Sequence, residues 1–179
     1  MFLDEKEHWA EELRTRSANA KQALDSLGKE DLVVIGDTLL IGAFIGRRLL
    51  EEGLQSEQHV RDGKKHFASD SVLRLSDLAK RQIHLGGCWK IDLRSDEPIL
   101  DLNSNETLTL VSLLNQIIHL GSIQLWKSPS RENPCFWVGS PEHTNSKKTA
   151  RFHRVYWSSF SDWLGEIASA TVPSVSSRT

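Results

Sequence analysis

Apolar and small residues recur at intervals of three and four over the first part of the chain, which is the spacing of one face of an α-helix. The positions on this face are Ala10, Leu13, Ser17, Ala20, Leu24 and Leu27. Asp4 is suited to open this helix, and Gly28 ends it. A second helix is predicted from Asp31 to about Glu52, with Gly53 just past its end. Because only GKED joins the two helices, they must turn back on each other as a helical hairpin.

The second helix contains a long apolar run, LVVIGDTLLIGAFIG, from Leu32 to Gly46. A helix that spans a bilayer needs about 20 apolar residues, but this run is shorter and ends at two arginines. Asp37 in its middle would also be costly in lipid. The run therefore predicts a helix buried in a bundle, not a membrane span. Three of its glycines are expected to let a neighbouring backbone approach closely: Gly36, Gly42 and Gly46.

The middle of the chain predicts a loop and two more helices. Residues 54–70, LQSEQHVRDGKKHFASD, are polar and aperiodic, which is typical of a surface loop. A shorter helix follows over about 72–84. Residues 106–126 predict a third long helix, for which Ser104 or Asn105 is available as N-cap.

Alternation of apolar and polar residues, typical of half-buried strands, occurs in four short segments. CWKIDLR and PILDL predict a β-hairpin, and CFWVGS and RFHRVYW predict two further strands. A last short helix covers 159–170. Four tryptophans are expected to pack the strands against the helices: Trp89, Trp137, Trp157 and Trp163.

These elements together predict a mainly α (α+β) fold, an antiparallel helical bundle with a small antiparallel β appendage. A length of 179 residues suits one domain with a substantial core. We expect this domain to cover residues 1–170, with β insertions at about 88–102 and 135–157. The polar end of the chain, residues 171–179, is expected to be a disordered tail.

Composition and charge narrow the classes of function. The net charge of −2 gives no general attraction for nucleic acid, so any such contact must come from a local patch. The two cysteines have no CxxC partner, which favours reduced thiols over a zinc site or a disulfide framework. We expect no metal and no cofactor, and no phosphate-binding glycine loop, HExxH or GxSxG motif is present. The acidic start MFLDEKEHWAEELR lacks signal-peptide features, so a cytoplasmic location is expected.

The predicted helix over 106–126 is largely apolar, yet it carries a strip of three polar residues, Ser112, Asn115 and His119. Buried polar groups that lack hydrogen bonds cost about 1–3 kcal/mol each, so the strip needs partners. One interpretation is a buried network that ties this helix to a neighbour. The other is a cleft in which His119 transfers protons and Asn115 orients it.

The segment LLNQIIH, on a late helix after an N-terminal helical hairpin, resembles the motif of the HEPN superfamily of small helical bundles. Many of these proteins are dimeric, metal-independent ribonucleases of toxin–antitoxin and phage-defence systems. Asn115 and His119 match the motif's polar residue and histidine, but Leu114 stands where the motif has arginine. The resemblance implies His119 as general acid and base, with Asn115 as its orienting group. Without the arginine, either activity is lost or another cation binds the phosphate. Arg47 and Arg48 are the candidates, of which we select Arg48. The alternative for both is a solvated last turn of the second helix, favoured by the helix dipole.

Two other segments carry candidate chemistry. RDGKKH, from Arg61 to His66, has the full Arg-to-His spacing of the motif, but one such match is expected by chance and the segment is not helical in pattern. The segment KKTARFHRVYW offers cations for RNA phosphates at Lys147, Lys148, Arg151 and Arg154. Phe152 or Tyr156 could stack a base. The alternative is a half-buried strand with charged outer residues.

We therefore expect a HEPN-like prokaryotic protein that binds RNA or cleaves it without a metal, or has lost that activity, in a toxin–antitoxin or phage-defence setting. Its expected partners are RNA and either a second copy of the chain or a cognate protein, with no membrane. The alternative is a non-catalytic helical interaction module that assembles with a partner protein.

Overall fold

The computed structural model describes residues 3–26, 29–65, 69–85, 88–92, 98–101, 107–119, 124–126, 135–140 and 149–172. The fold is mainly helical with a smaller antiparallel β part, as the sequence predicted. The chain divides into two compact units. The first combines Met1–Arg81 with Ser161–Thr179, and the second is Gln82–Phe160. A single domain over 1–170 stays a prediction.

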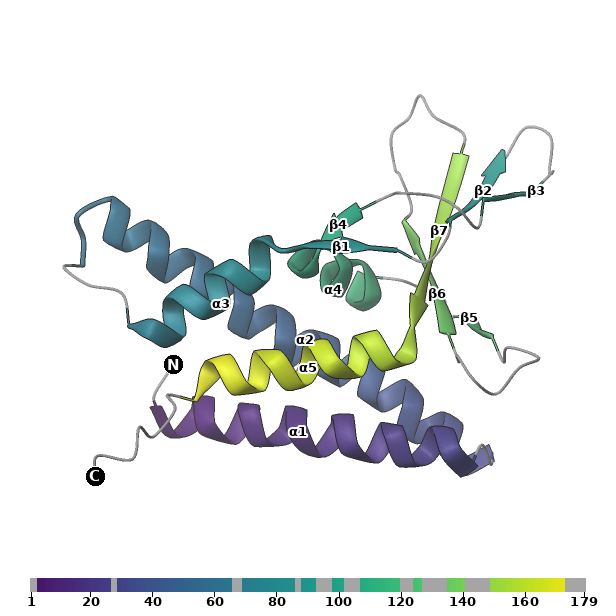
Figure 1. Ribbon diagram of the computed structural model, residues 1–179, viewed down its shortest axis with the longest axis horizontal. Coiled ribbons are helices and arrows are strands. Elements are labelled where there is room, and N and C mark those ends of the chain that lie inside the picture. Colours follow the sequence, from purple (N-terminus) through teal and green to yellow (C-terminus); the bar gives the residue numbers. More distant parts are fainter. Residues whose placement is uncertain are drawn as a thin grey trace. The chain divides into compact units, whose positions relative to one another are not determined.

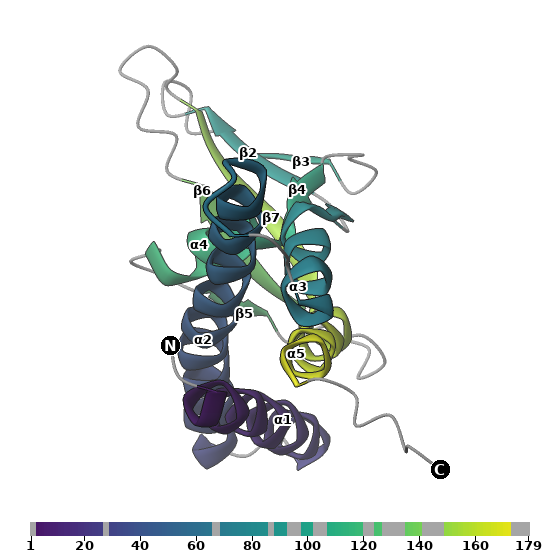
Figure 2. The ribbon, with the colours of Figure 1, turned by 90° about the vertical axis from the view of Figure 1, so that its left-hand side faces the viewer.

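The first unit is helical. It contains α1 (Leu3–Ser26), α2 (Lys29–Arg61), α3 (Asp70–Lys80) and, from Ser161 onward, α5 (Trp157–Thr171). α1 and α2 pack along each other as the predicted hairpin, and α3 packs against α2 (Figure 1). Seen from the side, α5 lies between α1 and α3 (Figure 2). The predicted helices at 4–27 and 159–170 are confirmed within two residues at each end.

Buried apolar side chains line the inner faces of these helices at the spacing that the sequence pattern predicts. They include Ala10, Leu13, Ile35, Leu39, Ala43, Leu49, Leu50, Leu75, Ala79, Leu164, Ile167 and Ala168. At Gly42 the close neighbour is a side chain, since a Cβ built there would lie 2.9 Å from Leu164 Cδ1. Nothing lies within 4 Å of the Cβ position of Gly36. The expected close approach of a neighbouring backbone is therefore not found at either glycine.

α2 continues past Gly53 to Arg61, so the predicted helix end is wrong, and the predicted loop over 54–70 is wrong for residues 54–61. Residues 62–65 and Ser69 are not helical, as that prediction expected. Gly53 is buried inside the helix, and α3 crosses so close that a Cβ built there would lie 2.7 Å from Leu75 Cβ. One turn further on, the carboxylate of Glu57 accepts hydrogen bonds from Ser76 and Lys80 of α3 and also pairs with Arg61. Contacts with α3 therefore stabilise a helical segment whose own sequence lacks an apolar period.

α3 is shorter than the predicted helix over 72–84. It begins after Ser69, whose hydroxyl accepts a hydrogen bond from the backbone N–H of Val72, as an N-cap does. It ends at Lys80, and the next residues form β1 (Gln82–His84) instead of a last helical turn.

The second unit contains two antiparallel sheets. β1 pairs with β4 (Thr107–Thr109) in a two-stranded sheet. The larger sheet has the order β3-β2-β7-β6-β5. Its strands are β2 (Cys88–Asp92), β3 (Pro98–Asp101), β5 (Gln124–Trp126), β6 (Cys135–Ser140) and β7 (Thr149–Tyr156). The predicted hairpin of β2 with β3 and the two predicted strands β6 and β7 are confirmed.

The third long helix predicted over 106–126 is only α4 (Leu110–His119), because strands β4 and β5 occupy the ends of that segment. Its candidate N-caps Ser104 and Asn105 lie outside the described residues. In the same unit Trp157 is buried and packs edge-on against Phe136 of β6, with ring centroids 5.7 Å apart. Phe160 completes this aromatic cluster at 5.5 Å from Phe136, so the predicted packing role of the tryptophans is confirmed for Trp157.

The apolar run predicted a helix buried in a bundle, and one face of α2 is instead exposed. Val33, Leu40, Ile41 and Phe44 are between 38% and 66% exposed. No helix in the part of the chain that the structure describes is long and apolar enough to cross a membrane. At the other end of the chain, Thr171 is buried and belongs to α5, so the predicted start of the tail at residue 171 is wrong. Residues 173–179 of that predicted tail lie outside the described ranges.

Candidate nucleic-acid interface

The polar strip of α4 is not a buried unit, because its members have different environments. Ser112 is half-buried, and its hydroxyl lies 2.6 Å from the hydroxyl of Thr109. The backbone N–H of Ser112 also donates to Thr109 Oγ1 at 3.3 Å. These are the contacts of an N-cap residue with the third residue of the helix. Ser112 therefore helps to fix the start of α4.

Asn115 and His119 are exposed and lie one turn apart on the same face of α4. Of the two interpretations of the strip, the buried network therefore does not hold for Asn115 and His119. The buried face consists of Leu110, Leu113, Leu114 and Ile117. It includes the position at which the HEPN motif has arginine, so a cation at 114 would point away from the face of Asn115 and His119.

Arg48, the cation selected to replace the missing arginine, is exposed on α2 in the first unit. Asn115 and His119 belong to the second unit, so the joint action of the three residues stays a prediction. Arg61 of the rival motif RDGKKH ends α2, where its guanidinium pairs with Glu57. The histidine of that motif lies outside the described residues.

Of the four predicted phosphate ligands, Lys147 and Lys148 lie outside the described residues. Arg151 is the third residue of β7, opposite Lys90 of β2 and Ser140 of β6. Arg154 lies near the centre of the larger sheet, opposite Trp137 of β6. Two of the four candidates are thus carried by the central strand of the sheet.

The alternation along β7 separates its residues by type. His153 and Val155 are buried on one face, on which Phe136 and Val138 of β6 pair with them. Phe152, Arg154 and Tyr156 are half-buried on the other face, since successive residues of a strand point to opposite sides. The Arg154 guanidinium lies over the Tyr156 ring, 5.2 Å from its centroid. The sequence pattern did not separate a basic face from an aromatic face, because this half-buried face carries both kinds of residue.

The register between β6 and β7 adds a third aromatic residue, which the sequence pattern missed. Trp137, also half-buried, stands opposite Arg154 across the β6–β7 pair, and directly opposed residues share a face of the sheet. We call Trp137, Phe152, Arg154 and Tyr156 the aromatic face. Register also places Trp89 of β2 opposite Phe152 and Trp126 of β5 opposite Cys135. Two more tryptophan positions therefore adjoin this face.

Cys135 stands opposite Tyr156 at one end of the aromatic face. Burial raises the pKa of its thiol, and the nearby charge of Arg154 acts weakly in the other direction. The thiol therefore stays protonated at neutral pH and is a poor nucleophile. This favours a packing role for Cys135.

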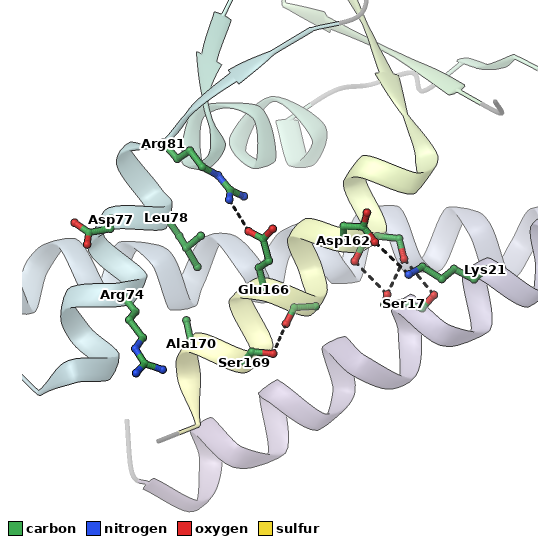
Figure 3. Close-up of a pocket in the computed structure, with 12 residues that line it drawn as sticks. Ser17, Lys21, Arg74, Asp77, Leu78, Arg81, Asp162, Glu166, Ser169 and Ala170 are labelled. Carbon is green, nitrogen blue, oxygen red and sulfur yellow. Dashed lines mark hydrogen bonds and ion pairs between the residues drawn. The ribbon is translucent and has the colours of Figure 1, made fainter. Parts of the chain in front are cut away.

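The first unit has a groove of about 1030 Å³ between α1, α3 and α5 (Figure 3). Its charged side chains are paired across it: Lys21 with Asp162 at 3.2 Å and Arg81 with Glu166 at 2.6 Å. Arg74 and Asp77 of α3 add one more charge of each sign. Because the lining charges cancel, the groove offers no net attraction for an anion such as RNA.

Within the described ranges, no three His, Cys, Asp or Glu side chains are placed so that they could hold a metal ion. No protein-family model, curated protein or solved structure matches the chain. The HEPN resemblance therefore rests on its two matched positions alone.

Proposed function

We propose that this protein binds single-stranded RNA on the aromatic face of its larger sheet. The observation that carries the proposal is the arrangement of Trp137, Phe152 and Tyr156 around Arg154 on one half-buried face. Following the HEPN resemblance, we place this activity in the cytoplasm, in a phage-defence or toxin–antitoxin setting.

The chemistry of single-stranded RNA matches this face. Unpaired bases stack on aromatic side chains, and sheets that carry two or three such residues bind RNA in this way. From Phe152 to Tyr156 the strand rises about 13 Å, at ~3.3 Å per residue, so successive aromatic rings can meet different bases. A guanidinium between them supplies both a phosphate contact and a stacking surface. A duplex would hide its bases from such a face.

The test is the affinity for a short fluorescein-labelled single-stranded RNA, measured by fluorescence anisotropy. Trp137→Leu and Phe152→Leu keep an apolar side chain but remove the ring, and each should weaken binding about tenfold, since stacking contributes ~1–3 kcal/mol per base. Trp9→Leu is the matched control, because Trp9 is also half-buried but lies on α1. Arg154→Gln should lower the slope of log affinity against log salt by about 0.7, the value for one phosphate contact on a single strand.

The results can contradict the proposal in two ways. If wild-type protein binds duplex RNA as well as single-stranded RNA, base stacking is not the mode of recognition. If the variants of the aromatic face bind like the Trp9→Leu control, the binding site lies elsewhere. Circular dichroism of each variant distinguishes lost binding from lost folding.

RNA cleavage is a second activity, favoured by the exposure of Asn115 and His119 on one face of α4. There His119 would accept the proton of a ribose 2′-hydroxyl as its oxygen attacks the adjacent phosphorus, and would return a proton to the leaving 5′-oxygen, with Asn115 as orienting group. His119→Ala should abolish cleavage of a labelled RNA and leave both binding and the thermal midpoint unchanged, because His119 is exposed. Cleavage that persists in this variant, or that EDTA abolishes, would refute this mechanism.

A further inference from the structure

One face of α2 carries a continuous stripe of exposed residues, most of which are apolar. The stripe consists of Val33, Asp37, Leu40, Ile41, Phe44 and Arg48, all of which are exposed. Their spacings of four, three, one, three and four residues place them on one side of a helix with 3.6 residues per turn. Phe44 is flanked by the ring of Trp9 on α1, 6.3 Å away between centroids. Apolar stripes of this kind, bordered by charged residues, mark interaction surfaces.

The two charged residues of the stripe indicate its partner. Asp37 and Arg48 lie on either side of Leu40, Ile41 and Phe44, eleven residues and about three turns apart. When two identical stripes cross in antiparallel orientation, Asp37 of each copy meets Arg48 of the other, and Ile41 meets Phe44. A two-fold axis thus creates two opposite-charge contacts around an apolar centre, which is the self-complementarity that an isologous interface requires.

We propose that the chain forms a two-fold symmetric dimer through this α2 stripe, with the two α2 helices antiparallel. The interface is independent of the proposed RNA-binding face, which lies on other elements. A parallel pairing is disfavoured, because it would bring Asp37 against Asp37 and Arg48 against Arg48.

Sedimentation equilibrium of the full chain tests the dimer. Wild-type protein should show a concentration-dependent monomer–dimer equilibrium, and Phe44→Glu should remain monomeric at every concentration examined. Leu73→Glu is the matched control, because Leu73 is 46% exposed on α3, outside the stripe. That variant should dimerise like wild type. Wild-type protein that stays monomeric, or a Leu73→Glu variant that dissociates as Phe44→Glu does, would overturn the proposal.

A charge exchange tests the antiparallel register. Asp37→Arg and Arg48→Asp should each weaken dimerisation roughly tenfold or more, since each converts two attractive contacts into repulsive ones. The double variant Asp37→Arg/Arg48→Asp restores both attractions and should recover nearly wild-type association. Both positions are exposed, so the single variants are expected to fold. A double variant as weak as the single ones would overturn the proposed pairing.

Discussion

Replacing Gly53 with alanine tests the contact that extends α2 beyond its predicted end. A Cβ at this position would lie 2.7 Å from Leu75 Cβ, 3.0 Å from the backbone nitrogen of Ser76 and 3.1 Å from the carbonyl carbon of Leu75. These atoms belong to the backbone of α3 or are fixed to it, so the helix itself must move. Overpacking of this kind lowers the free energy of unfolding by about 3 kcal/mol, the upper end of its usual range. Alanine has the higher helix propensity, which restores about 1 kcal/mol. The free energy of unfolding should therefore fall by about 2 kcal/mol.

Gly36→Ala is the matched control on the same helix. Nothing lies within 4 Å of its Cβ position, so only the propensity gain of about 1 kcal/mol remains. For a chain of this size, 1 kcal/mol corresponds to a shift of about 2–4 °C in the thermal midpoint. Gly53→Ala should therefore melt about 4–8 °C lower than wild type, and Gly36→Ala about 2–4 °C higher, in thermal unfolding followed by circular dichroism. Equal midpoints for the two variants would refute the close approach of α3 to α2.

Three further predictions concern named contacts. The hydrogen bonds from Lys80 and Ser76 lower the pKa of Glu57 to about 2 from its usual 4.5; because the folded pKa is the lower one, this stabilisation is present above pH 4.5 and is lost as the pH falls toward 2. Urea unfolding should therefore show a smaller loss of stability over that range for Glu57→Gln than for wild type. Thr109→Ala removes the N-cap of α4 and should lower the free energy of unfolding by about 1 kcal/mol, whereas an unchanged value would exclude capping. Ser17 and Ser161 share a buried hydrogen bond of 2.7 Å; their alanine variants should be less than additive in a double-mutant cycle, and strict additivity would show that the hydroxyls act independently.

The elements that the sequence predicted well are those whose stability comes from their own pattern. The helical hairpin of α1 and α2 follows from a clear three-to-four period and a short connection. The hairpin of β2 and β3 follows from alternation across a turn. The end of α2 could not be predicted in this way, because residues beyond Gly53 are held by α3 and not by an apolar period.

α4 was predicted too long for a related reason. The apolar residues on both sides of it belong to strands β4 and β5, and a short apolar run does not distinguish a buried helix from a strand by pattern alone. In the shorter α4, Asn115 and His119 lie on the exposed face, whereas Ser112 is half-buried against the capping residue Thr109.

The candidate RNA site was predicted in part. The sequence indicated Arg154 as a phosphate ligand and Phe152 or Tyr156 as stacking residues, and all three occupy one face of β7. Trp137 could not be added from the sequence, because its place opposite Arg154 depends on the register between β6 and β7. Register is set by tertiary pairing, and a shift of one residue would have put Trp137 on the other face.

Photo-cross-linking of a thiouridine-substituted single-stranded RNA, with the cross-linked peptides identified by mass spectrometry, tests the proposed RNA-binding face most directly. Cross-links should map to β6 and β7, and the modified residues should be Trp137, Phe152 and Tyr156. Cross-links confined to the helices α1, α2 and α3, or to α4 around His119, would contradict the proposal.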